Sequence, residues 1–344
     1  MKPATAQEDR MATLVASYPH ETGEHCASTA LRNLLAHRGT RLSEGMVFGL
    51  ASGLGFFYFE NDQTSPSRMF HGRTGTLESD FGRNTGVDFV DREEPDDARA
   101  WQLLRERLDA GEPVMLSTDT YYLRYHNTTS HFPGHRCVAV GYDDDTETVL
   151  IADRKFAEYQ RCSYSELRQS RNALDYAMSC ENRWGDFGTE AGLGRPLEEA
   201  VPIALERTAR QFLAPEPGLP AGLPAMRALA AAFPSWSDAA DWSWAARFGY
   251  QVIIKRGAGG SFFRSLYADF LQEAAPMVPR VASADLPERM SEIAGRWRAL
   301  ASCLKEQSER ETCDPSLFDR ASRLTSDLAD REQRFFQDCL ALLS

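Results

Sequence analysis

A cysteine that could act as a nucleophile stands at the start of the first strong helical pattern. Residues 26–37 repeat apolar side chains every three or four positions, which predicts a helix that begins at Cys26 and ends before Gly39. A thiol attacks as its thiolate, and the unpaired N–H groups and dipole of a helix N-terminus stabilise that charge. Cys26 is therefore the candidate nucleophile, although taken alone such a cysteine is more often an inert core residue.

A histidine and an aspartate lie at the two ends of a predicted β-hairpin. In HRCVAVGYDDDTETVLIADR, residues 135–154, two apolar runs flank an Asp-rich turn. If Asp143–Asp145 forms the loop, His135 lies opposite Asp153 on one face, with Cβ atoms about 4.5–5.5 Å apart. A loop one residue longer or shorter would place the two side chains on opposite faces. A carboxylate beside the imidazole fixes its tautomer and favours the imidazolium, which suits His135 as the base for Cys26.

Other groups near these positions are weaker alternatives. His126 and His131 are close to His135 along the chain, but His135 begins a regular strand that fixes its direction. His25 adjoins the nucleophile and is expected to point elsewhere. His131, His135 and the run Asp143–Asp145 are too widely separated along the hairpin for a metal site, so no metal is expected. The Asp run itself is typical of a turn.

Composition argues against several classes of protein. The chain has 344 residues, of which 42% are hydrophobic and 26% charged, as in globular proteins with room for two domains. A net charge of −12 argues against a uniformly basic, nucleic-acid-binding surface. The first 20 residues lack the apolar run of a signal peptide, and no run could span a bilayer, so we expect a cytoplasmic protein. Seven scattered cysteines without a CxxC argue against a disulfide framework or a zinc site.

The pattern of the chain changes near residue 185, which predicts two domains. Residues 12–188 contain the Cys-led helix and alternating apolar runs, which predict an α+β domain with an antiparallel sheet. Residues 195–344 are mostly helical, with a Pro- and Gly-rich loop at 215–224. Helical patterns there cover residues 196–213, 223–233, 261–274, 287–304 and 316–342.

Several separated segments resemble the butirosin biosynthesis protein H family. EHCASTALRNLLAHRGTRLSEGMVFGLASGLGFFYF resembles the N-terminal domain of that family, and HFPGHRCVAVGYDDDTETVLIADR resembles its His and Asp region. RFGYQVIIKRGAGGSFFRSLYADFLQEA resembles the core of the helical domain that accompanies it. The resemblance implies a papain-like fold, related to the peptidases that trim bacteriocin leaders, with Cys26, His135 and Asp153 at the catalytic positions. It is specific for the family and not for the substrate.

The resemblance also implies an acyltransferase or amide synthase of natural-product and antibiotic biosynthesis. Such an enzyme would move an acyl group from a carrier-protein thioester to a small-molecule amine through an acyl-Cys26 intermediate. No cofactor would be bound, since phosphopantetheine would arrive on the acyl carrier protein. A papain-like peptidase or amidohydrolase that uses the same triad is one alternative, and a non-catalytic binding or scaffold protein is another.

One departure from wider papain-like patterns concerns the oxyanion of the tetrahedral intermediate. Those enzymes usually carry a Gln several residues before the cysteine, whereas this chain has His20-Glu21-Thr22 there. The backbone N–H of Cys26 can supply one donor. His20 and the backbone of Gly53–Gly55 are candidates for the second.

Three further residues are candidates for substrate binding. Phe56 and Tyr58 belong to an aromatic run that could line an acyl site or form a buried strand. His131 lies near the candidate base along the chain and could face the same site.

A stretch of the helical domain is free of acidic residues and could bind a partner. From Trp242 to Ala268 there is no Asp or Glu, yet the stretch contains Arg247, Lys255, Arg256 and Arg264. A basic patch around Lys255 and Arg256 would steer an acidic carrier protein toward the chain. The glycine-rich turn before Ser261 could hold the pantetheine phosphate, or the turn and the basic residues could be ordinary solvated surface.

Overall fold

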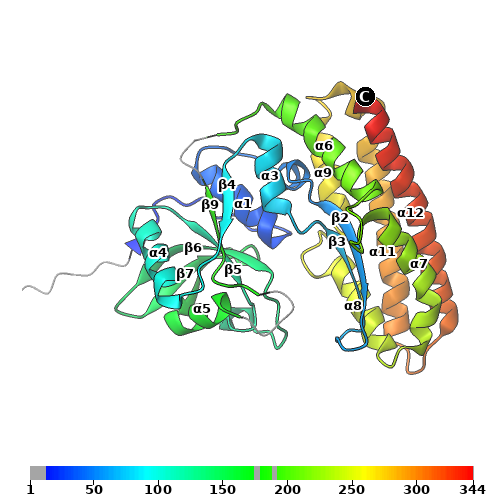
Figure 1. Ribbon diagram of the computed structural model, residues 1–344, viewed down its shortest axis with the longest axis horizontal. Coiled ribbons are helices and arrows are strands. Elements are labelled where there is room, and N and C mark those ends of the chain that lie inside the picture. The colour runs from blue at the N-terminus through cyan, green and yellow to red at the C-terminus, as the bar shows by residue number, and fades with distance from the viewer. Residues whose placement is uncertain (1–12, 174–178, 188–191, 344) are drawn as a thin grey trace, which may run out of the picture. The chain divides into compact units, whose positions relative to one another are not determined.

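The computed structural model describes residues 13–173, 179–187 and 192–343 and divides the chain into two compact units (Figure 1). The first unit comprises Met1–Arg41 and Asp88–Gly192, and the second comprises Leu42–Val87 and Leu193–Ser344. As expected from the sequence, the fold is α+β, with an antiparallel sheet in the first unit and a mostly helical second unit. None of the helices in the described ranges is both long and apolar enough to cross a membrane.

The first unit is built around a sheet of seven antiparallel strands. Six of them follow the order β4-β9-β5-β6-β7-β8, and β1 pairs with β6. The strands are β1 (Thr13–Leu14), β4 (Phe89–Arg92), β5 (Val114–Thr118), β6 (His135–Asp143), β7 (Thr148–Ala152), β8 (Gln160–Ser163) and β9 (Trp184–Phe187). Strand β6 is buried along nearly its whole length, as its Val-rich sequence requires. A short 3₁₀ turn, η1 (Arg124–His126), lies between β5 and β6.

Three helices pack against this sheet. They are α1 (Cys26–His37), α4 (Asp97–Asp109) and α5 (Tyr164–Arg171). Leu31 and Leu34 are buried on the apolar face of α1, and the helix packs against β6. The bounds of α1 agree with the periodicity of the sequence. This packing fixes the N-terminus of α1, and therefore Cys26, relative to the strand that begins at His135.

The second unit combines a two-stranded hairpin with a set of helices. The hairpin consists of β2 (Leu54–Glu60) and β3 (Arg68–Arg73). The helical elements are α2 (Glu44–Leu50), α3 (Leu77–Thr85), α6 (Leu197–Leu213), α7 (Gly222–Ala232), η2 (Phe233–Asp238), α8 (Trp242–Ile254), α9 (Arg264–Ala274), α10 (Pro279–Ser283), α11 (Leu286–Ser308) and α12 (Pro315–Leu343). Figure 1 shows α11 and α12 side by side, and α7 also packs against α12. The last helical pattern of the sequence is thus one long helix.

Residues 42–87 belong to the second unit, whereas the sequence pattern predicts that they form one domain with the cysteine and histidine segments. Packing explains the difference. The ring of Phe56 on β2 lies against Phe262 and Trp297, and all three are almost fully buried. Gly49 on α2 meets α9 so closely that an added Cβ would lie 1.9 Å from the ring of Phe270. Sequence proximity to α1 gives no indication of these distant partners.

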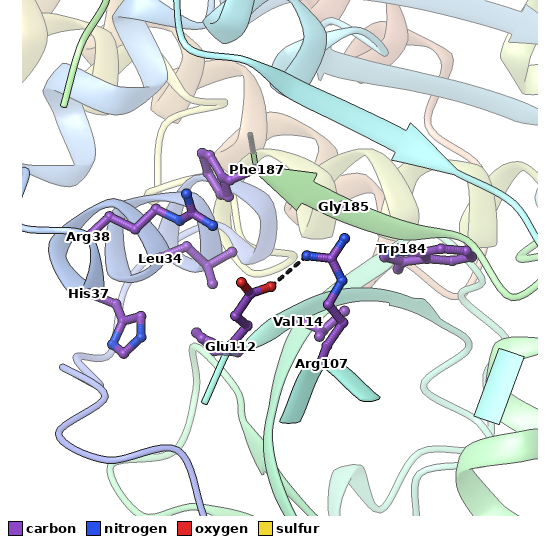
Figure 2. Close-up of a pocket in the computed structure, with 10 residues that line it drawn as sticks. Leu34, His37, Arg38, Arg107, Glu112, Val114, Trp184, Gly185 and Phe187 are labelled. Carbon is purple, nitrogen blue, oxygen red and sulfur yellow. Dashed lines mark hydrogen bonds and ion pairs between the residues drawn. The ribbon is translucent and has the colours of Figure 1, made fainter. Parts of the chain in front are cut away.

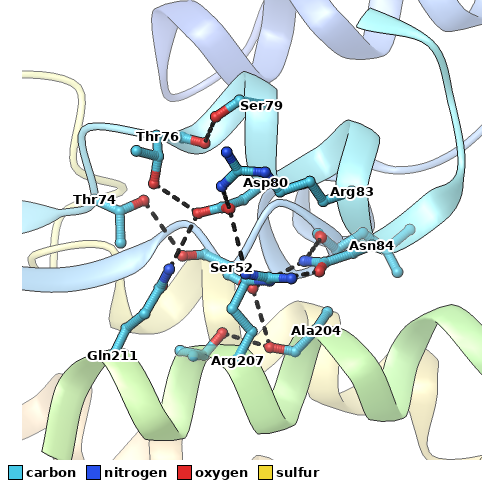
Figure 3. A network of polar contacts seen from close by, with 12 residues as sticks. Ser52, Thr74, Thr76, Ser79, Asp80, Arg83, Asn84, Ala204, Arg207 and Gln211 are labelled. Atoms are coloured by element: carbon cyan, nitrogen blue, oxygen red, sulfur yellow. Dashed lines mark hydrogen bonds and ion pairs between the residues drawn. The ribbon is translucent and has the colours of Figure 1, made fainter. Parts of the chain in front are cut away.

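A polar network also joins residues 42–87 to α6 (Figure 3). Asn84 donates to the carbonyl of Leu50 at 2.7 Å and to the hydroxyl of Ser52 at 3.0 Å, while Arg207 Nε donates to Asn84 Oδ1 at 2.8 Å. Ser52 Oγ donates in turn to the carbonyl of Ala204 at 3.1 Å. Because Ser52 and Asn84 are fully buried, their bonds avoid unsatisfied polar atoms, and together with the bond from Arg207 they fix α3 against α6.

The centre of the second unit holds a fully buried ion pair. Arg264 Nη2 lies 2.7 Å from Glu332 Oε2, and neither side chain is exposed. Trp297 Nε1 donates to Glu332 Oε1 at 2.7 Å, and Arg264 also donates to the carbonyls of Phe262 and Gly72. Arg264 therefore has a structural role and is not part of the basic surface that the sequence suggested.

Candidate functional site

The first unit brings Cys26, His135 and Asp153 together. His135 Nε2 lies 2.7 Å from Asp153 Oδ2, and the imidazole of His135 is near enough to the Cys26 thiol to lower the pKa of that thiol. Since Nε2 pairs with Asp153, Nδ1 is the ring nitrogen of His135 left to serve the thiol. All three residues are buried, and Asp153 is not exposed at all. A thiol, an imidazole and a carboxylate in series are the groups that thiol-dependent acyl transfer requires.

The β6–β7 hairpin reaches this geometry by a route that differs from the expected one. Asp143 pairs with Thr148, so the loop consists of the four residues 144–147 and is one residue longer than expected. That loop alone would set His135 and Asp153 on opposite faces of the hairpin. A β-bulge between Ala139 and Gly141 shifts the register by one residue and returns the two side chains to the same face.

Two residues of the β5–β6 connection also hydrogen-bond to the carboxylate of Asp153. Tyr125 Oη donates to Asp153 Oδ2 at 3.1 Å, and His126 Nε2 lies 3.0 Å from the same oxygen. The rings of His126 and His135 meet edge to face, with centroids 4.9 Å apart. From the sequence, His126 is only an alternative to His135 as the base, and Tyr125 is not a candidate. The only feature of the sequence that points to Tyr125 is the aromatic run that precedes strand β6.

His126, His135 and Asp153 are also residue types that bind metal ions, and their ligand atoms lie within 4.8 Å of one another. Both histidines direct Nε2 at a single carboxylate oxygen at hydrogen-bonding distance. That oxygen occupies the point on which the two rings converge. We therefore interpret the group as a hydrogen-bonded network that orients His135.

The charges of the site favour a thiolate and an imidazolium. Burial raises the pKa of the Cys26 thiol, but the charges and hydrogen bonds of His25 and His135 outweigh burial and hold this pKa well below its usual range. Burial lowers the pKa of His135, but the charge of Asp153 and the hydrogen bonds to Asp153 and Cys26 raise it to about 10. Burial likewise acts to raise the pKa of Asp153, but His135 and His126 keep it far below its usual range. The carboxylate is therefore charged throughout the physiological range.

These pKa shifts predict how the ionisation and reactivity of the Cys26 thiol depend on pH. A depressed thiol pKa means that Cys26 stays ionised below about pH 8.5, where an ordinary cysteine takes up its proton. Iodoacetamide should therefore alkylate Cys26 at a constant rate through neutral pH, as followed by peptide mass spectrometry. Cys162, whose pKa burial raises to about 12, serves as the internal control and should not react there. A Cys26 profile with an ordinary midpoint near pH 8.5 would contradict the ion pair.

His25 points toward the nucleophile, so the expectation that it points elsewhere is wrong. His25 is the N-cap of α1, and its side chain folds back over the first turn to accept the N–H of Ser28. This fold brings its Nε2 to 3.9 Å from Cys26 Sγ. Histidine is not among the preferred N-cap residues, so the sequence does not indicate this orientation of the His25 ring.

His20 holds the segment before Cys26 against the turn that follows Asp153. Its Nε2 donates to the carbonyl of Phe156 at 2.7 Å, whereas its Nδ1 is buried without a hydrogen-bond partner. A neutral ring that donates from Nε2 has only a lone pair at Nδ1. His20 could thus donate to an oxyanion only as an imidazolium. Gly53–Gly55, the other candidate, lies in the second unit.

The remaining candidate residues lie elsewhere. His131 Nδ1 is 2.7 Å from Asp119 Oδ2, so it pairs with a different carboxylate from that of His135. Phe56 and Tyr58 are in the second unit with exposed fractions of 1% and 8%, and the hydroxyl of Tyr58 accepts from Trp236 Nε1 at 3.1 Å. Both therefore occur in a buried strand, the alternative that the sequence left open.

Lys255 and Arg256 are exposed in the second unit, directly after α8. Lys255 Nζ lies 5.5 Å from the centroid of the Tyr250 ring, and the Arg256 guanidinium lies 4.8 Å from that of Phe248. Their charged groups thus cover aromatic side chains of the same helix.

A cavity of about 350 Å³ lies at the other end of α1 (Figure 2). Its lining residues are Leu34, His37, Arg38, Arg107, Glu112, Pro113, Val114, Trp184, Gly185 and Phe187. Arg107 and Glu112 form an ion pair of 2.5 Å within it. Because α1 rises about 16 Å over its 12 residues, this cavity is remote from Cys26.

Comparison with protein families agrees with the resemblance. Residues 25–154 match the model described as "Butirosin biosynthesis protein H, N-terminal", and this range includes Cys26, His135 and Asp153. Residues 165–339 match the model described as "Domain of unknown function (DUF4872)". The name of the first model associates it with an enzyme of antibiotic biosynthesis. The chain belongs to the butirosin biosynthesis protein H-like family, in which the second domain follows the first. A comparison with curated proteins finds no match.

Proposed function

We propose that this protein is a cysteine-dependent acyltransferase that forms amides through an acyl-Cys26 intermediate. The observation that carries the proposal is the buried series of Cys26, His135 and Asp153, with the thiol at the first residue of a helix. The thiol at a helix start and the base on an antiparallel strand together make a papain-like arrangement. Membership of a family named for an antibiotic-biosynthesis protein favours synthesis over degradation.

The first half-reaction would transfer the acyl group to the enzyme. The Cys26 thiolate attacks the carbonyl carbon of an acyl thioester, and the carbonyl electrons move to oxygen to give a tetrahedral oxyanion. The backbone N–H of Cys26 can donate to that oxyanion. When the intermediate collapses, the bond to the donor sulfur breaks, and the departing thiolate takes the proton from the His135 imidazolium. The products are acyl-Cys26, neutral His135 and the free donor thiol.

The second half-reaction would transfer the acyl group to an amine. The amine nitrogen attacks the thioester carbonyl and loses one proton to neutral His135. Collapse then breaks the bond between carbon and Cys26 Sγ, which releases the amide. Cys26 returns to the thiolate and His135 to the imidazolium, so the ion pair is restored without any external proton donor. Asp153 keeps the tautomer and orientation of His135 constant through both steps.

Product analysis tests transfer against hydrolysis. The protein is incubated with a soluble acyl thioester, with and without a primary amine, and the amide and the free acid are quantified. The proposal expects amide as the main product and little free acid while amine is present. Free acid formed at the same rate with and without amine would instead indicate a hydrolase that uses the same triad.

We propose an acidic acyl carrier protein as the partner that delivers the thioester, with phosphopantetheine as the arm it carries. The supporting observation is a patch on and after α8, defined as Trp244, Arg247, Phe248, Lys255 and Arg256. Trp244 is 37% exposed and packs edge to face on Phe248, and cationic groups lie over the neighbouring rings. Arg247 pairs with Glu309 at 3.3 Å, so Lys255 and Arg256 are the residues expected to attract an acidic surface.

Charge reversal in this patch tests the partner. The double variant Lys255→Glu, Arg256→Glu should slow acylation of Cys26 by a carrier-bound donor, and the loss should be greatest at low salt, because screening weakens steering. Acylation by a small soluble thioester is measured in parallel and should not share the loss.

The control reverses two exposed arginines of α12, Arg320→Glu with Arg323→Glu, which changes the net charge equally. An equal loss in this control, or an equal loss with both donors, would contradict docking at the α8 patch.

A further inference from the structure

We infer that His25 is a second histidine that serves Cys26, by donating its Nε2–H to the thiolate. Its ring reaches the sulfur atom from the helix cap, whereas His135 reaches it from strand β6. The inference rests on the proposed function, because it takes Cys26 as the nucleophile. It adds to the triad a hydrogen-bond donor that does not have to give up its proton during the reaction.

The helix cap determines which ring nitrogen of His25 carries the proton. Nδ1 lies 3.4 Å from the backbone N of Ser28 and 3.3 Å from its hydroxyl, and the backbone N–H can only donate. Nδ1 must therefore present its lone pair, and the proton of the neutral ring lies on Nε2. The backbone of His25 is extended, with φ −122° and ψ 136°, as the N-cap position requires. The cap thus selects the tautomer that can donate toward Cys26.

The position of the ring makes this donor effective. Nε2 lies 3.9 Å from Cys26 Sγ, within the longer range of hydrogen bonds to sulfur, and His25 is only 4% exposed. Water therefore competes little for the thiolate. The titratable groups that act directly on the thiol are His25 and His135, and Asp153 lies behind His135. A hydrogen bond from His25 also acts to lower the pKa of the thiol, which agrees with this geometry.

The proposed reaction needs such a donor in its second half. While the amine attacks, His135 receives the amine proton and Cys26 leaves as a thiolate. An anion that appears in a buried site is costly unless it is hydrogen-bonded. His25 can donate at that moment without any change in its own protonation, because its Nδ1 remains bound to the cap. The two histidines would thus have separate tasks, proton transfer for His135 and charge stabilisation for His25.

The variant that isolates this role is His25→Asn. Asparagine is among the best N-cap residues, so the start of α1 is retained, but its short amide cannot reach Sγ as Nε2 does. The pH profile of Cys26 alkylation by iodoacetamide should keep its shape and move up by about 1–2 pH units, as expected for the loss of one hydrogen bond to a charged group. At alkaline pH, above both midpoints, the wild type and the variant should react equally fast, which checks that access to Cys26 is intact.

The matched control is His37→Asn, which removes a histidine from the other end of the same helix. Its profile should match that of the wild type. His25→Ser, which also preserves a capping side chain, replaces the first variant if His25→Asn does not fold. Shifts confined to the His25 variants support the inference.

An unchanged profile in the His25 variants, or an equal shift in His37→Asn, would overturn the role of His25. Neither result would affect the proposed function, provided that wild-type Cys26 still reacts as a thiolate at neutral pH. If wild-type Cys26 does not react in that range, the nucleophile assignment fails, and the inference about His25 fails with it.

Discussion

Replacement of Cys26 by alanine should abolish acyl transfer and leave the fold intact. Without the thiol no acyl-enzyme can form, and loss of a nucleophile of this kind lowers the rate by a factor on the order of 10⁴–10⁶. The fold should survive because alanine is small, favours helices and fits a position that is 6% exposed. Thermal unfolding followed by circular dichroism checks this point alongside the rate.

Cys26→Ser provides a second, nearly isosteric variant. It should be almost as inactive, since His135 would have to remove a proton from a far weaker acid than a thiol. It should also be insensitive to iodoacetamide at this position. Activity close to that of the wild type in either variant would exclude Cys26 as the nucleophile and would favour a non-catalytic role for the cluster of Cys26, His135 and Asp153.

Replacement of His135 or Asp153 should give the second largest loss. His135→Ala removes the proton carrier, and its effect should approach that of Cys26→Ala. Asp153→Asn keeps the shape of the side chain but removes the charge that favours the His135 imidazolium, so the rate should fall by about 10²–10⁴. The pH profile of Cys26 alkylation should also move to higher pH. Without the Asp153 charge the His135 imidazolium is less favoured, so it stabilises the thiolate less.

His131 provides the comparison for this assignment, since it pairs with Asp119 and not with Asp153. The loss of rate in His131→Ala should be much smaller than in His135→Ala. The reverse order would show that the base has been assigned to the wrong histidine. Comparing Asp153→Asn with His126→Asn would show how far the second histidine on the carboxylate contributes to the orientation of His135.

The helix that carries Cys26 could be predicted from the sequence, whereas the orientation of its cap could not. The periodic apolar residues of 26–37 specify both the length of α1 and the face that it buries. The direction of the His25 ring depends on its hydrogen bond to the Ser28 N–H. The spacing of apolar residues carries no information about such a bond.

In the β6–β7 hairpin the predicted arrangement of side chains occurs, but a different backbone geometry produces it. The sequence indicated that His135 and Asp153 could share a face, and they do. The expected three-residue loop does not occur, and the β-bulge at Ala139–Gly141 compensates for the longer one. A bulge of this kind depends on the packing of neighbouring strands, here β1 and β5 on β6, and leaves little trace in the residue pattern.

Long-range packing explains most of the features of the second unit that the sequence does not predict. Residues 42–87 follow α1 directly, but their buried aromatic rings and the Asn84 network find partners more than a hundred residues later. Helix α8 was not predicted because apolar and aromatic residues occur around most of it. It therefore lacks the broad polar face by which an amphipathic helix is recognised. Arg264 resembled a surface charge because its partner, Glu332, is far along the chain.

Intact-protein mass spectrometry after incubation with acyl thioesters is the most direct test for an acyl-Cys26 intermediate. We expect a mass increase equal to one acyl group, located on Cys26 by peptide mapping and absent from Cys26→Ala. We also expect that addition of a primary amine removes the acyl group and releases the matching amide. An acyl group on another residue, or no stable or transient acylation of Cys26 with any thioester that the protein consumes, would show that Cys26 does not carry the acyl group.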